Sequence, residues 1–226
     1  MANRYVLKFT KNEYAKYTSH LDMLRFFKRA FRKNGISLRY SQGFNPHPKM
    51  SFAQPLSLGY SSSFELLEFE TETKYEAGQI YEMLCGEMPE GLKIEWVIEF
   101  EGNVKSLAAA ADSAEYEVRL PFKCEETVLG DMAARYLAQN EIITLKRRKK
   151  DKKMVSADIK NMIRRFEAKS DAEMTILDME LDCGSISNCS PELVISSFIE
   201  FSGLDIPRYR IDVERKKIKF VNNLQF

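Results

Sequence analysis

The sequence has 226 residues, of which 44% are hydrophobic, 30% charged and 12% aromatic, with only 10 Gly and 7 Pro. This composition is typical of a folded protein and excludes collagen-like, mucin-like and wholly disordered chains. The length allows one large domain or two small ones without disulfide or metal support, since one domain commonly has about 100–150 residues. The 34 Lys and Arg nearly balance the 33 Asp and Glu, so total charge alone predicts neither nucleic-acid nor membrane binding.

No segment has the pattern of a targeting or membrane-spanning sequence. Residues 1–9 alternate between polar and apolar and lack the apolar core of a signal peptide. No window approaches the ~20 apolar residues of a transmembrane helix. The four cysteines form no CxxC pair and have no nearby histidine. We therefore expect a cytoplasmic protein without membrane contact, whose thiols are reduced and mostly buried.

The first half of the chain alternates between strand-like and helix-like segments. Polar and apolar residues alternate over 5–9, which predicts a strand. Ser19 is placed to cap a helix that ends at Asn34-Gly35. Two prolines and a glycine exclude a helix at 41–48. The predicted order is βαββαβ, and its other extended or helical segments are 36–40, 50–58, 64–71, 75–88 and 93–100.

The second half repeats this order of elements. Small residues at 102–114 predict a linker. The segments expected after it are a strand at 115–120, a helix at 126–140, a strand at 142–146, an extra helix at 156–166, a strand at 174–181, a helix at 190–201 and a strand at 209–220. We therefore predict an α+β fold of tandem ferredoxin-like (βαββαβ) halves with antiparallel sheets. The N-terminal domain would cover residues 1–101 and the C-terminal domain residues 115–226.

The most distinctive sequence lies between Ser19 and Gly59. It contains SHLD at 19–22, YSQGFNPHP at 40–48 and PLSLG at 55–59. These motifs closely resemble those of the radical SAM-associated family of unknown function, in which an SHLD helix start precedes YSQGFNPHP and a [SA]-x-PLxxG segment. The second half is similar to the family in its order of elements, so the resemblance covers essentially the whole chain.

The family resemblance implies partners more than chemistry. Members of that family are fused to, or encoded beside, a radical SAM protein, often near genes for ribonuclease G and ribosomal proteins. This context implies a radical SAM partner and an RNA substrate, either tRNA or ribosomal RNA. The chain is not the radical enzyme itself, because it lacks the CxxxCxxC triad that holds the iron–sulfur cluster. We expect it to carry no cofactor.

The YSQGFNPHP loop supplies candidate binding residues. Its glycine, asparagine and two prolines favour a rigid loop, which loses little entropy on binding. If the loop folds back over the start of the preceding helix, one pocket would be lined by His20, Asp22, Gln42, Asn45 and His47, beside Phe44. The alternative is that the loop only locks the hairpin onto the helix. The spacing of His20, His47 and Asp22 is not diagnostic of a metal site, and we predict none.

Charge is segregated along the chain. Residues 20–49 contain seven Lys or Arg and one Asp, and residues 146–165 contain ten Lys or Arg and two Asp. Such stretches are able to neutralise phosphates, and nearby aromatic rings are able to stack on bases. The further binding candidates are Arg25, Arg29, Arg32, Arg39, Tyr40, Lys49, Arg147, Arg148, Lys149 and Lys150. The alternative interpretation of both stretches is an ordinary solvated surface.

Residues 65–101 contain eleven Glu and two Lys. This acidic stretch either docks a basic partner or pairs with basic residues of the same chain.

Three functions are compatible with these features. The leading hypothesis is an accessory RNA-binding or substrate-presenting protein that acts with a separate radical SAM enzyme in RNA or ribosome modification. The second is an adaptor that docks this enzyme through residues 65–101 without contacting RNA. The third is a metal-free RNA-processing enzyme with His20 or His47 as general base, by analogy with CRISPR-type endoribonucleases of tandem ferredoxin-like fold. Against the third, residues 208–226 lack the glycine-rich loop of those enzymes.

Overall fold

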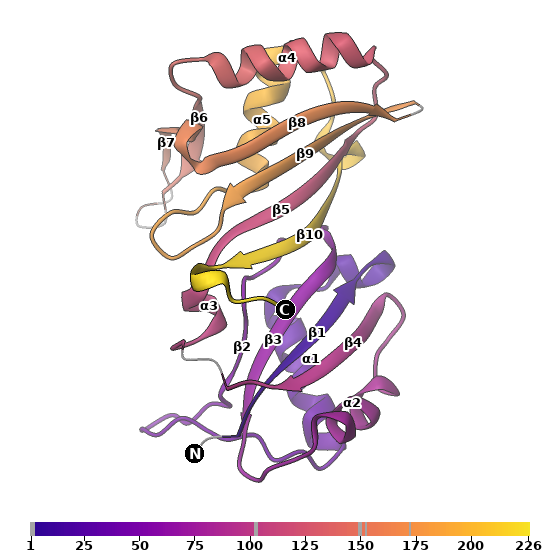
Figure 1. Cartoon of the computed structure of the whole chain (residues 1–226), viewed down its shortest axis with the longest axis vertical. Helices are drawn as coiled ribbons and strands as arrows, with labels where there is room; N and C mark the ends of the chain where they lie inside the picture. Colours follow the sequence, from indigo (N-terminus) through magenta and orange to yellow (C-terminus); the bar gives the residue numbers. More distant parts are fainter. Residues whose placement is uncertain (1–2, 102–103, 149–150, 152, 172) are drawn as a thin grey trace. The chain divides into compact units, whose positions relative to one another are not determined.

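The chain divides into two compact units in this computed structural model (Figure 1). Unit 1 comprises Met1–Ala111 and Phe220–Phe226, and unit 2 comprises Asp112–Lys219. The structure describes residues 3–101, 104–148, 151, 153–171 and 173–226. Both units combine helices with antiparallel strands, so the predicted α+β class is confirmed.

Unit 1 is built on an antiparallel sheet. Its strands are β1 (Asn3–Lys11), β2 (Met50–Phe52), β3 (Ser61–Thr71) and β4 (Leu92–Glu99). They lie in the order β4-β1-β3-β2. The helices are α1 (His20–Lys33), α2 (Ala77–Cys85) and the short α3 (Leu107–Ala110), and a 3-10 turn, η1 (Glu13–Tyr17), follows β1.

The core of unit 1 follows from the alternation along β1. Tyr5, Leu7 and Phe9 point to one face of the sheet and belong to a single buried cluster with residues of both α1 and α2. The Phe9 ring lies 5.1 Å from the Phe27 ring of α1. Burying each such aromatic side chain contributes about 1.5–3 kcal/mol. Both helices therefore pack against the same face of the sheet.

Helix α1 begins and ends as predicted. The Ser19 hydroxyl accepts a hydrogen bond from the Asp22 backbone N–H at 3.2 Å and donates to the Asp22 carboxylate at 2.7 Å. Gly35, with φ of +71°, follows the C-cap Asn34. The helix buries Met23, Phe27, Ala30 and Phe31. This pattern leaves its charged residues on the outer side.

Unit 2 is also built on antiparallel strands. Its strands are β5 (Ala111–Leu120), β8 (Ile163–Asp171), β9 (Met174–Asp182) and β10 (Asp212–Phe220), in the order β10-β5-β9-β8. The helices are α4 (Glu126–Ala138) and α5 (Pro191–Ser202). A separate two-stranded hairpin is formed by β6 (Ile143–Arg147) and β7 (Met154–Asp158). Rings from α4, β8 and α5 pack 5.0–5.3 Å apart in the core, and they belong to Tyr136, Phe166 and Phe198.

The extra helix predicted at 156–166 is wrong. This segment contains the end of β7, a 3-10 turn at Lys160–Met162 and the start of β8. The Asp158 carboxylate accepts backbone hydrogen bonds from Ile142 at 2.9 Å and Lys160 at 3.0 Å, which turns the chain between the strands. Pairing of β8 with β9 then supplies hydrogen bonds for the backbone of this segment. This pairing overrides the helical spacing of the apolar residues.

Some extended segments are shorter than expected, and the expected linker carries regular structure. In the segment 36–40, Leu38 and Tyr40 form isolated bridges to Thr71 and Pro48. The segment 50–58 contributes β2 at Met50–Phe52. Residues 107–110 form α3, and β5 begins at Ala111, so most of the expected linker is helix or strand; residues 102–103 lie outside the described residues.

None of the helices in the described part of the chain is long and apolar enough to cross a lipid bilayer.

Candidate nucleic-acid interface

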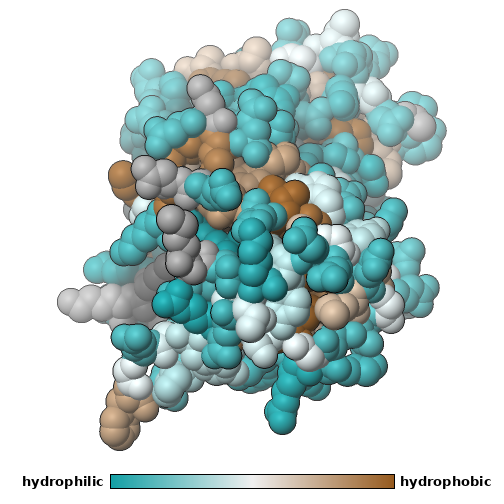
Figure 2. All heavy atoms as spheres, turned by 60° about the horizontal axis from the view of Figure 1, so that its bottom comes forward, coloured by the Kyte–Doolittle hydropathy of each residue, from teal (hydrophilic) through white to brown (hydrophobic). Residues whose placement is uncertain are grey.

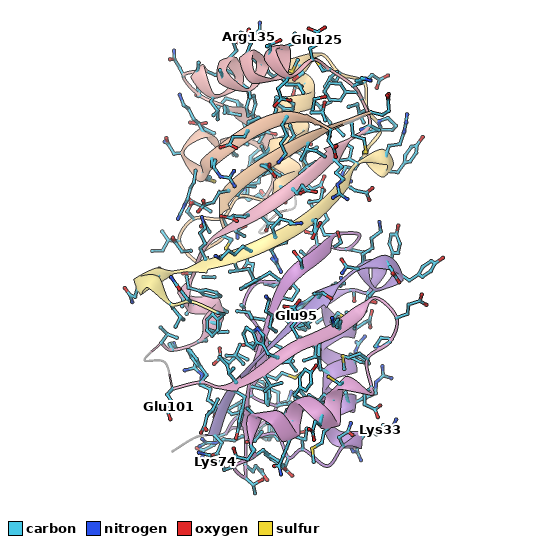
Figure 3. All side chains as sticks on the ribbon, turned by 45° about the vertical axis from the view of Figure 1, so that its right-hand side comes forward. Lys33, Lys74, Glu95, Glu101, Glu125 and Arg135 are labelled. Carbon is cyan, nitrogen blue, oxygen red and sulfur yellow. The ribbon has the colours of Figure 1, made fainter. Side chains whose placement is uncertain are left out.

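Helix α1 presents a basic surface to solvent. Five basic residues lie on its exposed side: Arg25, Lys28, Arg29, Arg32 and Lys33. Arg25 pairs with Asp22 at 2.8 Å, and Lys33, labelled in Figure 3, pairs with Glu87 at 2.8 Å. Across the described ranges of the chain, the other three form no ion pair. Their charges are therefore available to an anionic ligand.

Two of these cations line a groove in unit 1. Lys28 and Arg32 line an open groove of about 450 Å³, together with residues 35–38, Tyr40 and Glu72. The Tyr40 side chain is 44% exposed. Glu72 is the one carboxylate among the lining residues, so the groove combines a net positive charge with an aromatic ring. This combination suits a phosphate backbone carrying bases.

The YSQGFNPHP loop begins at the groove and closes on itself. Tyr40 bridges to Pro48, and the Ser41 backbone N–H donates to the His47 carbonyl at 2.9 Å. The Ser41 hydroxyl accepts a bond from the His47 backbone N–H at 3.1 Å. His47 Nδ1 lies 3.1 Å from the Ser41 hydroxyl. These contacts give the loop a defined shape.

The loop extends away from the sheet of unit 1 (Figure 1). Residues 42–47 are exposed, so Gln42 and Asn45 face solvent, and Phe44 is fully exposed. Gly43 has φ of +133°, a conformation that side chains rarely adopt. The loop therefore needs glycine at this position to present its aromatic tip. The face of the molecule in Figure 2 is mostly hydrophilic, with small hydrophobic groups.

Arg39 and Lys49, two other predicted contacts, share one carboxylate. Arg39 lies 3.4 Å from Glu70, and Lys49 lies 3.0 Å from it. Lys49 also lines a recess of about 280 Å³ with His47 and Lys105. Because one acid faces two cations here, these residues retain a net positive charge next to the loop.

His20 and His47 line separate cavities. His20 lines a small cavity with Lys11, Glu65 and Phe52, whereas His47 lines the recess beside Lys49. The Ser19 hydroxyl and Arg25 lower the pKa of Asp22, whose carboxylate they contact. The shared pocket expected from the sequence is therefore replaced by two distinct environments.

The His20 cavity contains two charged residues that are not among the candidates predicted from the sequence. Lys11 and Glu65 are each only 3% exposed, and the Lys11 ammonium donates to the Thr18 carbonyl at 2.9 Å. The cavity holds about 20 Å³, room for one water molecule or hydroxyl group. Desolvation lowers the pKa of His20, with the Glu65 carboxylate opposing and Lys11 reinforcing this shift. At neutral pH the imidazole is thus predominantly uncharged and able to accept a proton.

The sequence marks each of these two charged residues separately, although not their proximity. Lys11 continues the alternation that places Tyr5, Leu7 and Phe9 in the core. Glu65 lies two residues before the buried Leu67, so it points to the same side of its strand. Charged residues at core-facing strand positions are costly unless they have partners, which makes them candidates for a functional site.

The basic hairpin of unit 2 is only partly described. Arg148 has a 54% exposed side chain, and its Nε lies 3.6 Å from Asp151. The side chain of Arg147 and the whole of Lys149 and Lys150 lie outside the described residues. Binding by these predicted residues remains a prediction.

The acidic stretch at 65–101 pairs extensively with basic residues of unit 1. Glu68 lies 2.5 Å from Arg4, and Glu95 lies 2.8 Å from Lys8. Further ion pairs are Glu70–Lys49, Glu87–Lys33 and Glu99–Lys74. These carboxylates are thus engaged within the unit, as one of the two sequence interpretations expected.

No group of three or more His, Cys, Asp or Glu side chains able to hold a metal ion is found in the residues that the structure describes.

Together these features define an α+β protein that carries a basic groove and a rigid aromatic loop in its N-terminal unit. The chain belongs to the DUF2344 family, described as an uncharacterized protein conserved in bacteria, whose model matches residues 4–191. A search of curated proteins finds no match to the chain.

Proposed function

We propose that the protein is an accessory RNA-binding or substrate-presenting protein that acts with a separate radical SAM enzyme in RNA or ribosome modification. One observation carries the RNA-binding part of the proposal. Lys28, Arg29 and Arg32 are exposed on α1, and two of them line a groove that also contains Tyr40. Uncompensated cations beside an exposed aromatic ring are typical of nucleic-acid-binding surfaces.

The strand orders support a finer description of the fold. We propose that each unit is ferredoxin-like. The orders β4-β1-β3-β2 and β10-β5-β9-β8 correspond to each other, with one helix after the first strand and one before the last in each unit. The β6–β7 hairpin would then be an insertion in unit 2. Such tandem units are common in RNA-processing proteins, which supports the proposal by analogy.

The radical SAM partner is proposed from the SHLD and YSQGFNPHP motifs, which resemble those of radical SAM-associated proteins. In this arrangement the partner carries out the chemistry, and this chain holds the RNA. We further propose a cytoplasmic location, in line with four free cysteines. The adaptor alternative is less favoured, because five acids of this stretch, Glu68, Glu70, Glu87, Glu95 and Glu99, form ion pairs within unit 1.

The test is a fluorescence-anisotropy titration of tRNA and ribosomal RNA fragments over a salt series. The test variant is Lys28→Ala/Arg29→Ala/Arg32→Ala. The matched control removes three exposed cations outside the groove and loop: Lys93, Lys123 and Arg135, the last labelled in Figure 3. Both variants lose the same charge, so any difference between them reports position rather than total charge.

We expect the test variant to bind more weakly and with a shallower salt dependence. For a single strand, each lost phosphate contact reduces the slope of log K against log salt by about 0.7. Loss of two or three contacts would reduce this slope by about 1.4–2.1, whereas the control should retain it. Equal RNA affinity of the two folded variants would refute the groove as the binding site.

A second candidate function rests on the His20 cavity. There, a neutral His20 could act as general base on an RNA 2′-hydroxyl, which fits the cavity volume. His20 would take the 2′-hydroxyl proton as the 2′-oxygen attacks the adjacent phosphorus, and the bond from phosphorus to the 5′-oxygen would break as that oxygen takes a proton from water, giving a 2′,3′-cyclic phosphate. Cleavage of RNA in EDTA that His20→Gln abolishes would support this candidate. Absence of cleavage by the wild-type protein would eliminate it.

A further inference from the structure

We propose that the RNA segment held at the groove is single-stranded, with unpaired bases stacked on Tyr40 and Phe44. This inference rests on the RNA-binding function proposed above and specifies its substrate class. It predicts that loops, bulges or single-stranded ends are bound in preference to continuous duplex.

The first support is the chemistry of the groove. Lys28 and Arg32 lie one helical turn apart on α1, a rise of about 6 Å at 1.5 Å per residue. Tyr40 lines the same groove and is 44% exposed. A single strand presents phosphates and free base faces together. Its phosphates are therefore able to contact the two cations while a base stacks on the Tyr40 ring. A duplex stacks its bases internally and offers mainly phosphates and sugar hydroxyls.

The second support is the tip of the loop. Phe44 is fully exposed, although exposing an apolar ring to water is unfavourable. Hydrogen bonds between Ser41 and His47 hold the loop that presents this ring. The loop therefore loses little conformational entropy when it binds a ligand. A flat apolar ring presented this way suits stacking with a base, which any sequence offers.

The third support is the connection between the two rings. Tyr40 both lines the groove and forms the bridge to Pro48 that starts the loop. Gln42 and Asn45, exposed on the loop with Phe44, offer amide groups able to donate and accept hydrogen bonds. Free Watson–Crick edges, present only in unpaired RNA, are the matching partners.

The experiment compares three RNAs that share one sequence. The first is a single strand, the second the same strand annealed to its complement, and the third a hairpin with that sequence in its loop. The variants are Tyr40→Ala, Phe44→Ala and Phe44→Leu, which keeps an apolar side chain but removes the ring. Tyr209→Ala is the matched control, because Tyr209 is 87% exposed and belongs to unit 2.

We expect the single strand and the hairpin loop to bind about tenfold more tightly than the duplex. Tyr40→Ala and Phe44→Ala should each lower single-strand affinity by about fivefold or more. Duplex binding and the salt slope should stay unchanged, because no cation is lost. Phe44→Leu should behave like Phe44→Ala, and Tyr209→Ala like wild type.

The single-strand proposal and the RNA-binding proposal are overturned by different results. If duplex and single strand bind equally and the aromatic variants match wild type, the single-strand proposal is overturned. The RNA-binding function still stands in that case, provided that Lys28→Ala/Arg29→Ala/Arg32→Ala weakens binding. If none of the three RNAs binds at low salt, both proposals fall. Because both rings are exposed, circular dichroism and thermal melting should confirm that the variants fold.

Discussion

Ser41 and His47 hold the two ends of the exposed loop together through side chain and backbone. The Ser41 hydroxyl lies 3.1 Å from both the backbone N and the Nδ1 of His47, and a backbone hydrogen bond of 2.9 Å joins the same pair. The loop motif therefore has a structural role in addition to the binding role proposed for it. The two roles are compatible, because a loop presents Phe44 reproducibly only if its ends are fixed.

Removing the Ser41 hydroxyl should loosen the loop without unfolding the protein. Ser41→Ala loses the side-chain bonds to His47, and an exposed hydrogen bond of this kind contributes about 0.5–1.5 kcal/mol. We expect faster proteolysis within residues 41–48, a several-fold loss of single-strand affinity and an unchanged melting temperature. Ser185→Ala, at an exposed position of unit 2, is the control. Unchanged proteolysis would show that the backbone bridge alone fixes the loop.

Phe27→Ala should strongly destabilise unit 1. Phe27 is completely buried, and its ring lies 5.1 Å from Phe9 and 6.0 Å from Phe52. Truncation of a buried Phe typically costs about 3–5 kcal/mol of unfolding free energy. Leu21→Ala, on the exposed side of the same helix, should cost little. Urea denaturation checks both values, and equal effects of the two changes would contradict the packing of α1.

His20 should titrate below its ordinary pKa of 6.5, because burial disfavours its charged form. The unfolded chain then binds more protons than the folded one near pH 6, so the free energy of unfolding should fall as the pH decreases through this range. Proton NMR measures this titration directly, since the chain has only two histidines. His47→Gln assigns the signals. A His20 pKa above 6.5 would contradict the burial of this imidazole as the dominant influence on its titration.

The four cysteines should differ in reactivity. Burial raises the pKa of the Cys183 thiol to about 11 and that of Cys189 to about 12, so neither forms appreciable thiolate at neutral pH. Cys85 and Cys124 are partly exposed. We expect iodoacetamide to label these two first and the buried pair only after denaturation. Mass spectrometry of the labelled peptides tests this order of labelling. Rapid labelling of Cys189 in the folded protein would contradict it.

Elements with strong local signals were predictable from the sequence. The alternation at Tyr5, Leu7 and Phe9 identified β1, and Ser19 identified the start of α1, because strand alternation and helix capping depend on nearby residues alone. The basic side of α1 was also visible, since its charges follow directly from the helical period.

Features that depend on distant residues were not predictable in the same way. The apolar spacing around Ile159 suggested a helix, but pairing of β8 with β9 determined the structure. The cavity beside His20 combines Lys11 from β1 with Glu65 from β3, and no local pattern reports this proximity. The ion pairs of the acidic stretch likewise required the sheet to be known.

Ultraviolet cross-linking of bound RNA, followed by mass spectrometry of the linked peptides, tests the central claim most directly. We expect cross-links at Tyr40 and Phe44, with further links in peptides of α1 that contain Lys28 to Arg32. These links should disappear in Lys28→Ala/Arg29→Ala/Arg32→Ala and persist in the Lys93, Lys123 and Arg135 control. Cross-links confined to residues outside the groove and loop, unchanged in the α1 variant, would contradict it.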